Sequence, residues 1–331
     1  MLRYAVVGSG AVGGFYGIRL AHAGARVQFL LRRDVAEVRA RGLELESAEG
    51  DIRLAKPHLA GSWSQLEQCD VLLVAVKATA NADVLGHLAR HADRLIAPGG
   101  GILLVQNGIG AEPAYAAAAG CSVLGGLAVL CAHLIRPGTV RHLDLGSLTI
   151  AAHHPSGDAA GVCPLMLAIA DDLTRAGTEV HLDEDLVRAR WRKLMWNIPF
   201  NPLSVILDAT TDELMGDANT VELVRAIMNE VAAAAAAEGR TLPSGLIDGL
   251  LAATAGMAPY ATSMKLDADA GRPMEVEAML AEPLRRAALT GTAMPSVSVL
   301  HRELGFLDAR AQRRSGRPTS GQPPQAAPDP A

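Results

Sequence analysis

Lys193, Asn197 and Asn201 are the residues whose types and spacing most clearly suit chemistry. They recur every four residues in the run WRKLMWNIPFN at 191–201, so on a helix they drift by only about 40° per step and share one face. An ammonium and two amides suit a carbonyl or carboxylate ligand, and the aromatic side chains beside them favour a binding face over a solvent-facing stripe. Pro199 lies inside this helix, where a proline removes a hydrogen bond and bends the axis.

Gly8-Ser9-Gly10-Ala11-Val12-Gly13 forms a second group, with the spacing G-x-G-x-x-G. The first glycine of this motif permits a tight turn, the second lets a pyrophosphate approach the backbone, and the third lets a helix pack on a strand. Tyr4–Val7 before it reads as a buried strand, Gly13–Ala23 as a helix whose N-terminal N–H groups face the phosphates, and Val27–Leu31 as a second strand. This context favours a dinucleotide-binding loop over a purely structural glycine turn.

The end of the second strand indicates which dinucleotide is bound. Sites for NAD usually place an acid there to bind the ribose 2′-hydroxyl, whereas this chain has Leu31-Arg32-Arg33 and its first acid, Asp34, comes late. Arg32 suits a 2′-phosphate, which a guanidinium binds through charge-assisted hydrogen bonds. A solvated arginine pair on a loop is the alternative, and we favour NADP(H).

The remaining patterns of the first half predict an α/β domain with a doubly wound, Rossmann-type sheet. Further strands are expected at Asp70–Val76, Ile102–Val105, Ser122–Leu130 and Glu179–Leu182, helices at Val35–Arg41, Asn81–His91 and Cys163–Ala176, a hairpin at Gly42–Ser47 and Asp51–Lys56, a turn at Pro98–Gly101, and an antiparallel pair closing the sheet at Gly138–Arg141 and Leu148–Ala152. Lys77 and Asn107 each follow a strand. Ligands of such sheets bind beyond the carboxyl ends of the strands, so we expect both residues near the glycine loop.

From Asp183 onward the strand patterns give way to helical ones. Helices are expected at roughly Asp185–Phe200, Thr220–Glu238, Ser244–Ala255 and Met274–Thr290. Arg272-Pro273 would start the last one, with Glu275 and Glu277 near its positive end, where capping alone accounts for both acids. We therefore predict a Rossmann domain at 1–182, an all-α domain at 183–310 and, because the last residues are rich in Pro, Gly and Gln, a disordered tail at 311–331.

The composition narrows the class of protein. The 331 residues carry a net charge of −5 and no basic block interleaved with aromatics, which argues against nucleic acid as the main partner. No run approaches the roughly 18 apolar residues of a membrane span, and no signal-peptide pattern opens the chain. Four cysteines without C-x-x-C spacing suggest small buried residues in a reducing compartment. We expect a cytoplasmic protein without a metal site.

These blocks resemble those of the ketopantoate reductases (2-dehydropantoate 2-reductases), from Met1 to about Leu307. Several blocks occur here in the same order as in that family. They are GSGAVGG, VAVKA, QNGIG, WRKL followed by the two asparagines and PLS, TSM, RPMEVE and LRRA. The resemblance implies a Rossmann domain followed by an all-helical domain. It also implies reduction of the keto group of 2-dehydropantoate by NADPH, a step of pantothenate and coenzyme A synthesis.

The resemblance also implies which residues act on the substrate. Lys193 falls on the catalytic lysine, the proton donor to the developing alkoxide. Asn197, Asn201 and Ser263 fall on substrate-binding positions, and Asn107 falls on the asparagine between cofactor and substrate.

Four further matches concern the cofactor. The loop at Gly8–Gly13 falls on the family's pyrophosphate-binding loop, Arg32 on the arginine that meets the 2′-phosphate, Lys77 on a cofactor-side lysine and Glu275 on a glutamate that contacts the cofactor. The chain departs from the family at two places: Ala281-Glu282 stands where Asn-Gly or another glycine is common, and Ser296-Val297 stands where Thr-Asn is common.

Other interpretations remain open. Relatives with this fold act on other 2-keto acids, and a β-hydroxyacid dehydrogenase of the 6-phosphogluconate type also pairs a lysine with an asparagine four residues later, after a Rossmann domain. A non-catalytic NADP(H) sensor would use the helical half to bind protein partners. The partners we expect are a small 2-keto acid and, since the helical half is apolar enough to support it, a second copy in a homodimer.

Overall fold

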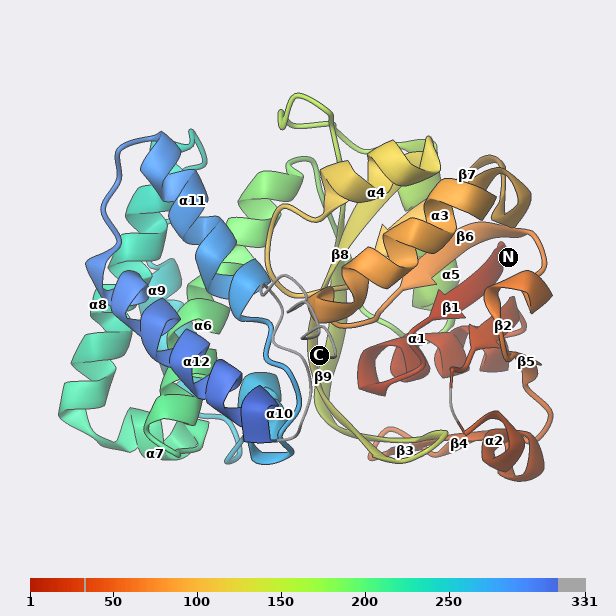
Figure 1. Ribbon diagram of the computed structural model, residues 1–331, viewed down its shortest axis with the longest axis horizontal. Helices are drawn as coiled ribbons and strands as arrows, with labels where there is room; N and C mark the ends of the chain where they lie inside the picture. The colour runs from red at the N-terminus through yellow and green to blue at the C-terminus, as the bar shows by residue number, and fades with distance from the viewer. Residues whose placement is uncertain (33, 315–331) are drawn as a thin grey trace, which may run out of the picture. The chain divides into compact units, whose positions relative to one another are not determined.

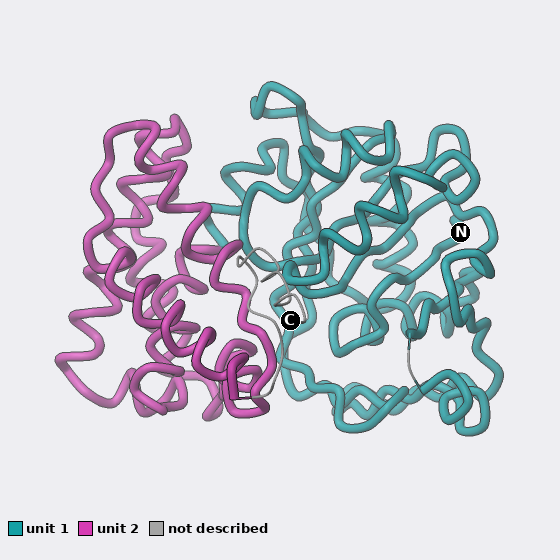
Figure 2. The backbone as a smooth tube through the Cα atoms, in the orientation of Figure 1, with its two compact units in different colours: residues 1–193 teal, residues 194–331 magenta. Residues whose placement is uncertain are grey.

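A computed structural model of the chain describes residues 1–32 and 34–314. The chain divides into two compact units, Met1–Lys193 and Leu194–Ala331 (Figure 2). Helix α6, Leu186–Ile206, spans the division, and the predicted domain boundary between residues 182 and 183 stays a prediction. Arg33 and residues 315–331, most of the predicted tail at 311–331, lie outside the described residues.

The first unit is built on a sheet of ten strands among the residues described (Figure 1). The strands are β1 (Arg3–Val7), β2 (Arg26–Leu30), β3 (Leu43–Ser47), β4 (Ile52–Leu54), β5 (His58–Ala60), β6 (Cys69–Val74), β7 (Ile96–Leu104), β8 (Ser122–Arg136), β9 (Thr139–Ala152) and β10 (Val180–Asp183). Their order is β4-β3-β9-β8-β7-β6-β1-β2-β5, with β10 paired to β9. Strands from β5 to β8 run parallel, and the chain order reverses between β1 and β6, where such sheets bind their ligands.

Helices cover both faces of this sheet. They are α1 (Ala11–His22), α2 (Val35–Arg41), α3 (Asn81–Leu95), α4 (Glu112–Ala119) and α5 (Pro164–Arg175). Because side chains alternate along a strand, Tyr4 and Val6 of β1 pack in one core with α1 and α5, whereas Ala5 and Val7 pack in the other with α3 and α4. The predicted doubly wound Rossmann-type fold is confirmed.

Two predicted breaks in the sheet are wrong. Apart from Gly138, which lies in the preceding turn, the residues of Gly138–Arg141 and Leu148–Ala152 belong to one strand, β9, which pairs with β8. Leu145 and Gly146 have positive φ and shift the register as a bulge without ending the strand. The predicted turn at Pro98–Gly101 lies within β7, again as an irregularity of pairing.

The second unit is helical, as predicted, in the part of the chain described. After α6 its helices are α7 (Thr211–Gly216), α8 (Ala218–Ala237), α9 (Leu246–Ala255), α10 (Ser263–Asp269), a π-helical turn at Glu277–Ala281 that leads into α11 (Glu282–Leu289), and α12 (Pro295–Arg314). Helix α8 contacts α11 and α12 and buries Val224, Ile227, Met228 and Val231, which recur at helical spacing.

The sequence patterns did not predict α12, because the group that caps it comes from another helix. The carboxylate of Glu230 in α8 accepts hydrogen bonds from the backbone N–H of Ser296 at 2.9 Å and of Val297 at 3.1 Å. The Ser296-Val297 departure therefore lies at a capped helix start. The prediction of disorder is wrong for residues 311–314, which end this helix and bury Gln312.

Helix α6 is longer than predicted. It continues through Pro199 and Pro202 to Ile206 instead of ending at Phe200. Ile198 and Leu203 are buried, and this packing offsets the hydrogen bonds that the prolines cannot make. Within the described residues, no helix has both the length and the apolar character needed to cross a membrane.

Candidate active site

The glycine loop between β1 and α1 has the conformation that a phosphate-binding loop requires. Gly8 has a φ of +99°, and a Cβ there would lie 2.5 Å from the backbone nitrogen of Val76. A Cβ on Gly13 would collide with the carbonyl oxygen of Gly8, so only glycine lets the helix close onto the strand. A Cβ on Gly10 would meet no atom within 4 Å, which leaves open space beside the N-terminal N–H groups of α1.

Arg32 lies just beyond β2 on the wall of a cavity of about 580 Å³. Its side chain is 63% exposed, and Nη1 donates to Oδ2 of Asp83 at 3.2 Å. Trp63 and His87, which also line the cavity, stack with 4.8 Å between ring centroids. Burial lowers the pKa of His87, so its imidazole is neutral at pH 7. An exposed guanidinium beside an aromatic wall can bind a nucleotide that carries a phosphate.

Lys77 and Asn107 follow β6 and β7 at the edge of the sheet that carries the glycine loop. The Lys77 side chain is exposed and Asn107 is half-buried. Gln106 joins their segments, because Nε2 donates to the carbonyl oxygen of Val76 at 2.8 Å and to Oδ1 of Asn81 at 2.7 Å. Both residues therefore lie at the edge where a ligand of the sheet would bind.

Lys193 is half-buried on the part of α6 that belongs to the first unit. Its Nζ donates to the carbonyl oxygen of Ala128 in β8 at 2.5 Å. Burial lowers the pKa of Lys193 to about 8; Cys131 opposes this decrease, and the positive charge of Arg190 adds to it. A lysine with a pKa near neutrality can both stabilise negative charge and release a proton.

Two buried charged residues near Lys193 escaped the sequence analysis. Arg190 donates from Nε and Nη2 to Oε1 of Glu112, at 2.9 and 2.5 Å, and both side chains are almost fully buried. Arg190 precedes Lys193 by three residues and so shares its helix face, which is the one signal that could have pointed to it. Glu112 is an acid in the first turn of α4, a common position for acids, so the sequence gives no sign of its role.

Three predicted substrate residues lie together in the second unit. Nδ2 of Asn201 donates to the carbonyl oxygen of Asn197 at 3.1 Å, and Oγ of Ser263 donates to Oδ1 of Asn201 at 3.4 Å. Asn197 and Asn201 are buried, so the polar stripe of α6 is not a solvent-facing one there. A buried cluster of amides and a hydroxyl offers both donors and acceptors to a ligand.

Glu275 lies directly before a helix that begins at Val276, not at Pro273 as predicted. Its side chain is buried, whereas that of Glu277 is 74% exposed and pairs with Arg285 at 2.6 Å. Glu277 lies in the first turn, near the positive end of the helix dipole, but a role at the helix start does not explain the burial of Glu275.

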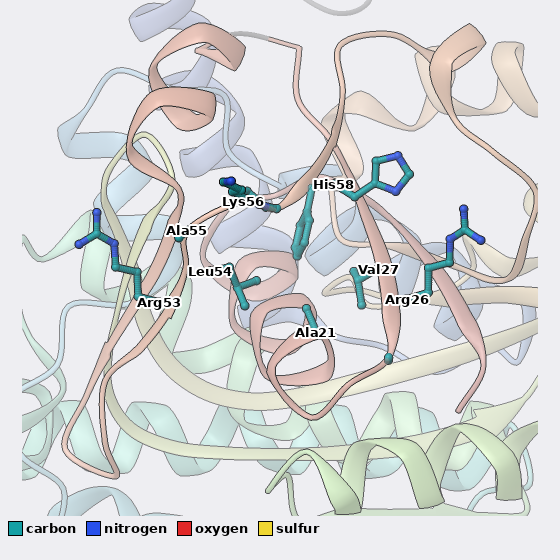
Figure 3. A pocket seen from close by; sticks show the side chains of 11 residues that line it. Ala21, Arg26, Val27, Arg53, Leu54, Ala55, Lys56 and His58 are labelled. Carbon is teal, nitrogen blue, oxygen red and sulfur yellow. The ribbon is translucent and has the colours of Figure 1, made fainter.

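A second cavity, of about 430 Å³, lies where β2 begins and contains none of the predicted site residues. Figure 3 shows Val27 and Leu54 between Arg53 on one side and Arg26 on the other. The described residues include no cluster of three or more His, Cys, Asp or Glu that could hold a metal ion. All four cysteines are free, two of them buried and two half-buried.

Two protein-family models match this chain. The model described as Ketopantoate reductase PanE/ApbA matches residues 4–155, and that described as Ketopantoate reductase PanE/ApbA C terminal matches residues 185–308.

Individual proteins match over nearly the whole length. A 2-dehydropantoate 2-reductase of Nostoc sp. is 41% identical over 319 residues, which cover 96% of this chain and 98% of the relative. The crystal structure of a 2-dehydropantoate 2-reductase from Geobacter metallireducens aligns with a TM-score of 0.86 at 35% identity, over 94% of this chain and 100% of that one. One from Methylococcus capsulatus aligns with a TM-score of 0.83 at 34% identity, over 94% and 98%.

Proposed function

The chain belongs to the ketopantoate reductase family, and we propose that it reduces 2-dehydropantoate to pantoate with NADPH. The resemblance noted in the sequence is thereby confirmed. The observation that carries the proposal is similarity to 2-dehydropantoate 2-reductases along nearly the whole chain.

The side chains fit the reduction of a ketone. The cofactor, when bound, supplies a hydride to the keto carbon. Lys193 stabilises the negative charge that develops on the oxygen and donates the proton that completes the hydroxyl group. Asn107, Asn197, Asn201 and Ser263 bind the hydroxyl and carboxylate of the substrate through amide and hydroxyl groups.

Membership of this reductase family implies a nicotinamide cofactor, and we propose that this cofactor is NADP(H). The loop at Gly8–Gly13 binds the pyrophosphate at the N-terminus of α1, and Arg32 binds the 2′-phosphate. Lys77 and Glu275 make further contacts to the cofactor. The open space at Gly10 and the exposed Arg32 guanidinium support this assignment.

The pH dependence of the reaction follows from the proposed role of Lys193. A proton donor must be protonated, so kcat/KM for keto-acid reduction is expected to fall as the pH rises through about 8. Cys131 also acts on Lys193, and burial raises the pKa of the Cys131 thiol to about 11, above this range. Steady-state rates from about pH 6 to about pH 10, with circular dichroism as the control for folding, test this expectation. A rate that stays constant up to about pH 10 would contradict it.

An absorbance assay of NADPH consumption tests the function itself. Turnover of 2-dehydropantoate well above that of other 2-keto acids supports the proposal. Faster turnover of another 2-keto acid would reassign the substrate. Hydroxy acids with NADP⁺ in the reverse direction test for a β-hydroxyacid dehydrogenase. NADPH binding without turnover of any substrate would favour a non-catalytic sensor.

Two expectations remain proposals beside the activity. The free cysteines fit a reducing compartment, and we propose a cytoplasmic location. We also propose a homodimer. Light scattering tests it: a mass near twice that of the 34.5 kDa chain would support the dimer, and a mass near that of one chain would contradict it.

A further inference from the structure

Arg190 connects the helix that carries Lys193 to the strand end that carries Asn107. Its Nη1 donates to the carbonyl oxygen of Gln106 at 2.5 Å, and its Nη2 donates to that of Leu104 at 3.4 Å. Gln106 immediately precedes Asn107, and Arg190 lies one helical turn before Lys193. The guanidinium therefore ties α6 to the end of β7 through two main-chain acceptors of that segment.

Glu112, the first residue of α4, fixes this guanidinium in turn. Its Oε1 accepts two of the guanidinium's hydrogen bonds, and only 3% of the Arg190 side chain and 4% of the Glu112 side chain are exposed. A buried ion pair is tolerated when its geometry is good and the remaining donors find acceptors, as the two carbonyl oxygens provide here. Gly125 in β8 leaves the necessary room, because a Cβ there would lie 3.2 Å from both Nη2 of Arg190 and Oε1 of Glu112.

Gln106 extends the linkage along the edge of the sheet. Its side chain binds the carbonyl oxygen of Val76 and Oδ1 of Asn81, which also accepts from the hydroxyl of Tyr115 at 2.9 Å. Val76 precedes Lys77 and packs against Gly8 of the glycine loop. Buried and part-buried contacts thus join α6, the ends of β6 and β7, and the cofactor loop into one network.

We propose that Arg190 is a positioning residue for the reduction: by binding the Gln106 carbonyl while Glu112 holds it, Arg190 fixes the ammonium of Lys193 relative to Asn107. The proposal rests on the proposed function for the roles of Lys193 and Asn107. Arg190 binds main-chain oxygens of the segment that leads to Asn107, so it acts on Asn107 through the backbone and on Lys193 through their shared helix.

Kinetics of Arg190→Met and Glu112→Gln test the proposal. We expect kcat to fall by about 10- to 100-fold with little change in the KM for NADPH, because a misplaced donor weakens the transition state more than cofactor binding. Arg188→Met is the control on the same helix, since it removes an arginine that is 46% exposed and paired with Asp183. Arg19→Met is the control for the loss of a buried arginine elsewhere in the unit, where Arg19 binds the carbonyl oxygen of Gly177 at 2.8 Å. Both controls should keep kcat within about twofold of the unchanged chain.

The pKa of Lys193 is a second measurement, which should stay unchanged if Arg190 only stabilises the fold. The positive charge of Arg190 contributes to the low pKa of Lys193, alongside burial and against Cys131 in β8. Arg190→Met should therefore raise the pKa of the Lys193 amine, measured by NMR of isotopically labelled lysine with Lys193→Met for assignment. Arg190→Lys keeps the charge but loses the forked geometry, so it should lower kcat without raising that pKa.

The outcomes separate this proposal from the function on which it rests. No turnover by the unchanged chain would remove the proposed reaction, while the NMR titration would still report whether Arg190 controls Lys193. If Arg190→Met does not fold, Arg190→Lys carries the kinetic test. Equal losses of kcat in the Arg190 and Arg19 variants, or an unmoved pKa of Lys193 in folded Arg190→Met, would overturn the positioning role.

Discussion

Replacing Lys193 by alanine is expected to lower kcat by about 10²–10⁴, the range usual for the loss of a general acid. The side chain is half-buried, and burial lowers the pKa of Lys193 to about 8, so the ammonium is poised to give up a proton near neutral pH. Alanine removes both the donor and the charge that stabilises the developing alkoxide. Steady-state kinetics with NADPH and 2-dehydropantoate measure the effect, and NADPH binding should persist.

Arg192→Ala is the matched control for this change. Arg192 neighbours Lys193 on α6 and carries the same charge, but its side chain is exposed. We expect its loss to leave kcat nearly unchanged. An unaltered kcat in Lys193→Ala, or an equal loss in Arg192→Ala, would rule out the specific role of Lys193.

The second large effect is expected at Arg32. Arg32→Ala should weaken NADPH binding by about 10- to 100-fold, since hydrogen bonds between charged groups contribute about 1.5–3 kcal/mol each. The binding of NADH should change little, because NADH has no 2′-phosphate for the guanidinium to bind. Asp83 competes for the same guanidinium at 3.2 Å, which places the expected loss toward the lower part of this range. Dissociation constants of both cofactors measure the ratio.

Arg26→Ala controls for the loss of an arginine at this strand. Arg26 opens β2, is 62% exposed and pairs with Glu67 at 2.5 Å, so it closely matches Arg32, which is 63% exposed and paired with Asp83. The control should leave the binding of both cofactors unchanged. Equal weakening of NADPH and NADH in Arg32→Ala would contradict the 2′-phosphate assignment.

The parts of the fold that local patterns control could be predicted from the sequence. The glycine loop has its strand and helix directly beside it, and the strands that precede Lys77 and Asn107 are short apolar runs that end in polar residues. Parallel pairing then brings these strand ends to one edge by geometry alone. The amide stripe of α6 was equally visible, because residues four apart share a helix face.

Contacts between distant segments could not be predicted. Arg190 and Glu112 are 78 positions apart, and neither position differs in type from an ordinary surface charge. The start of α12 depends on Glu230, 66 positions before Ser296, so its capping signal lies outside any local window. Strand β9 continues through a bulge that resembles a loop in sequence, since only its partner β8 keeps it extended.

The central claim is that the Lys193 ammonium gives its proton to the oxygen of the reduced keto group. A crystal structure of the complex with NADP⁺ and pantoate tests it most directly. We expect Nζ of Lys193 within about 3 Å of the pantoate hydroxyl oxygen that derives from the keto group. An Nζ that points away from this hydroxyl, with another side chain bound in its place, would show that Lys193 is not the proton donor.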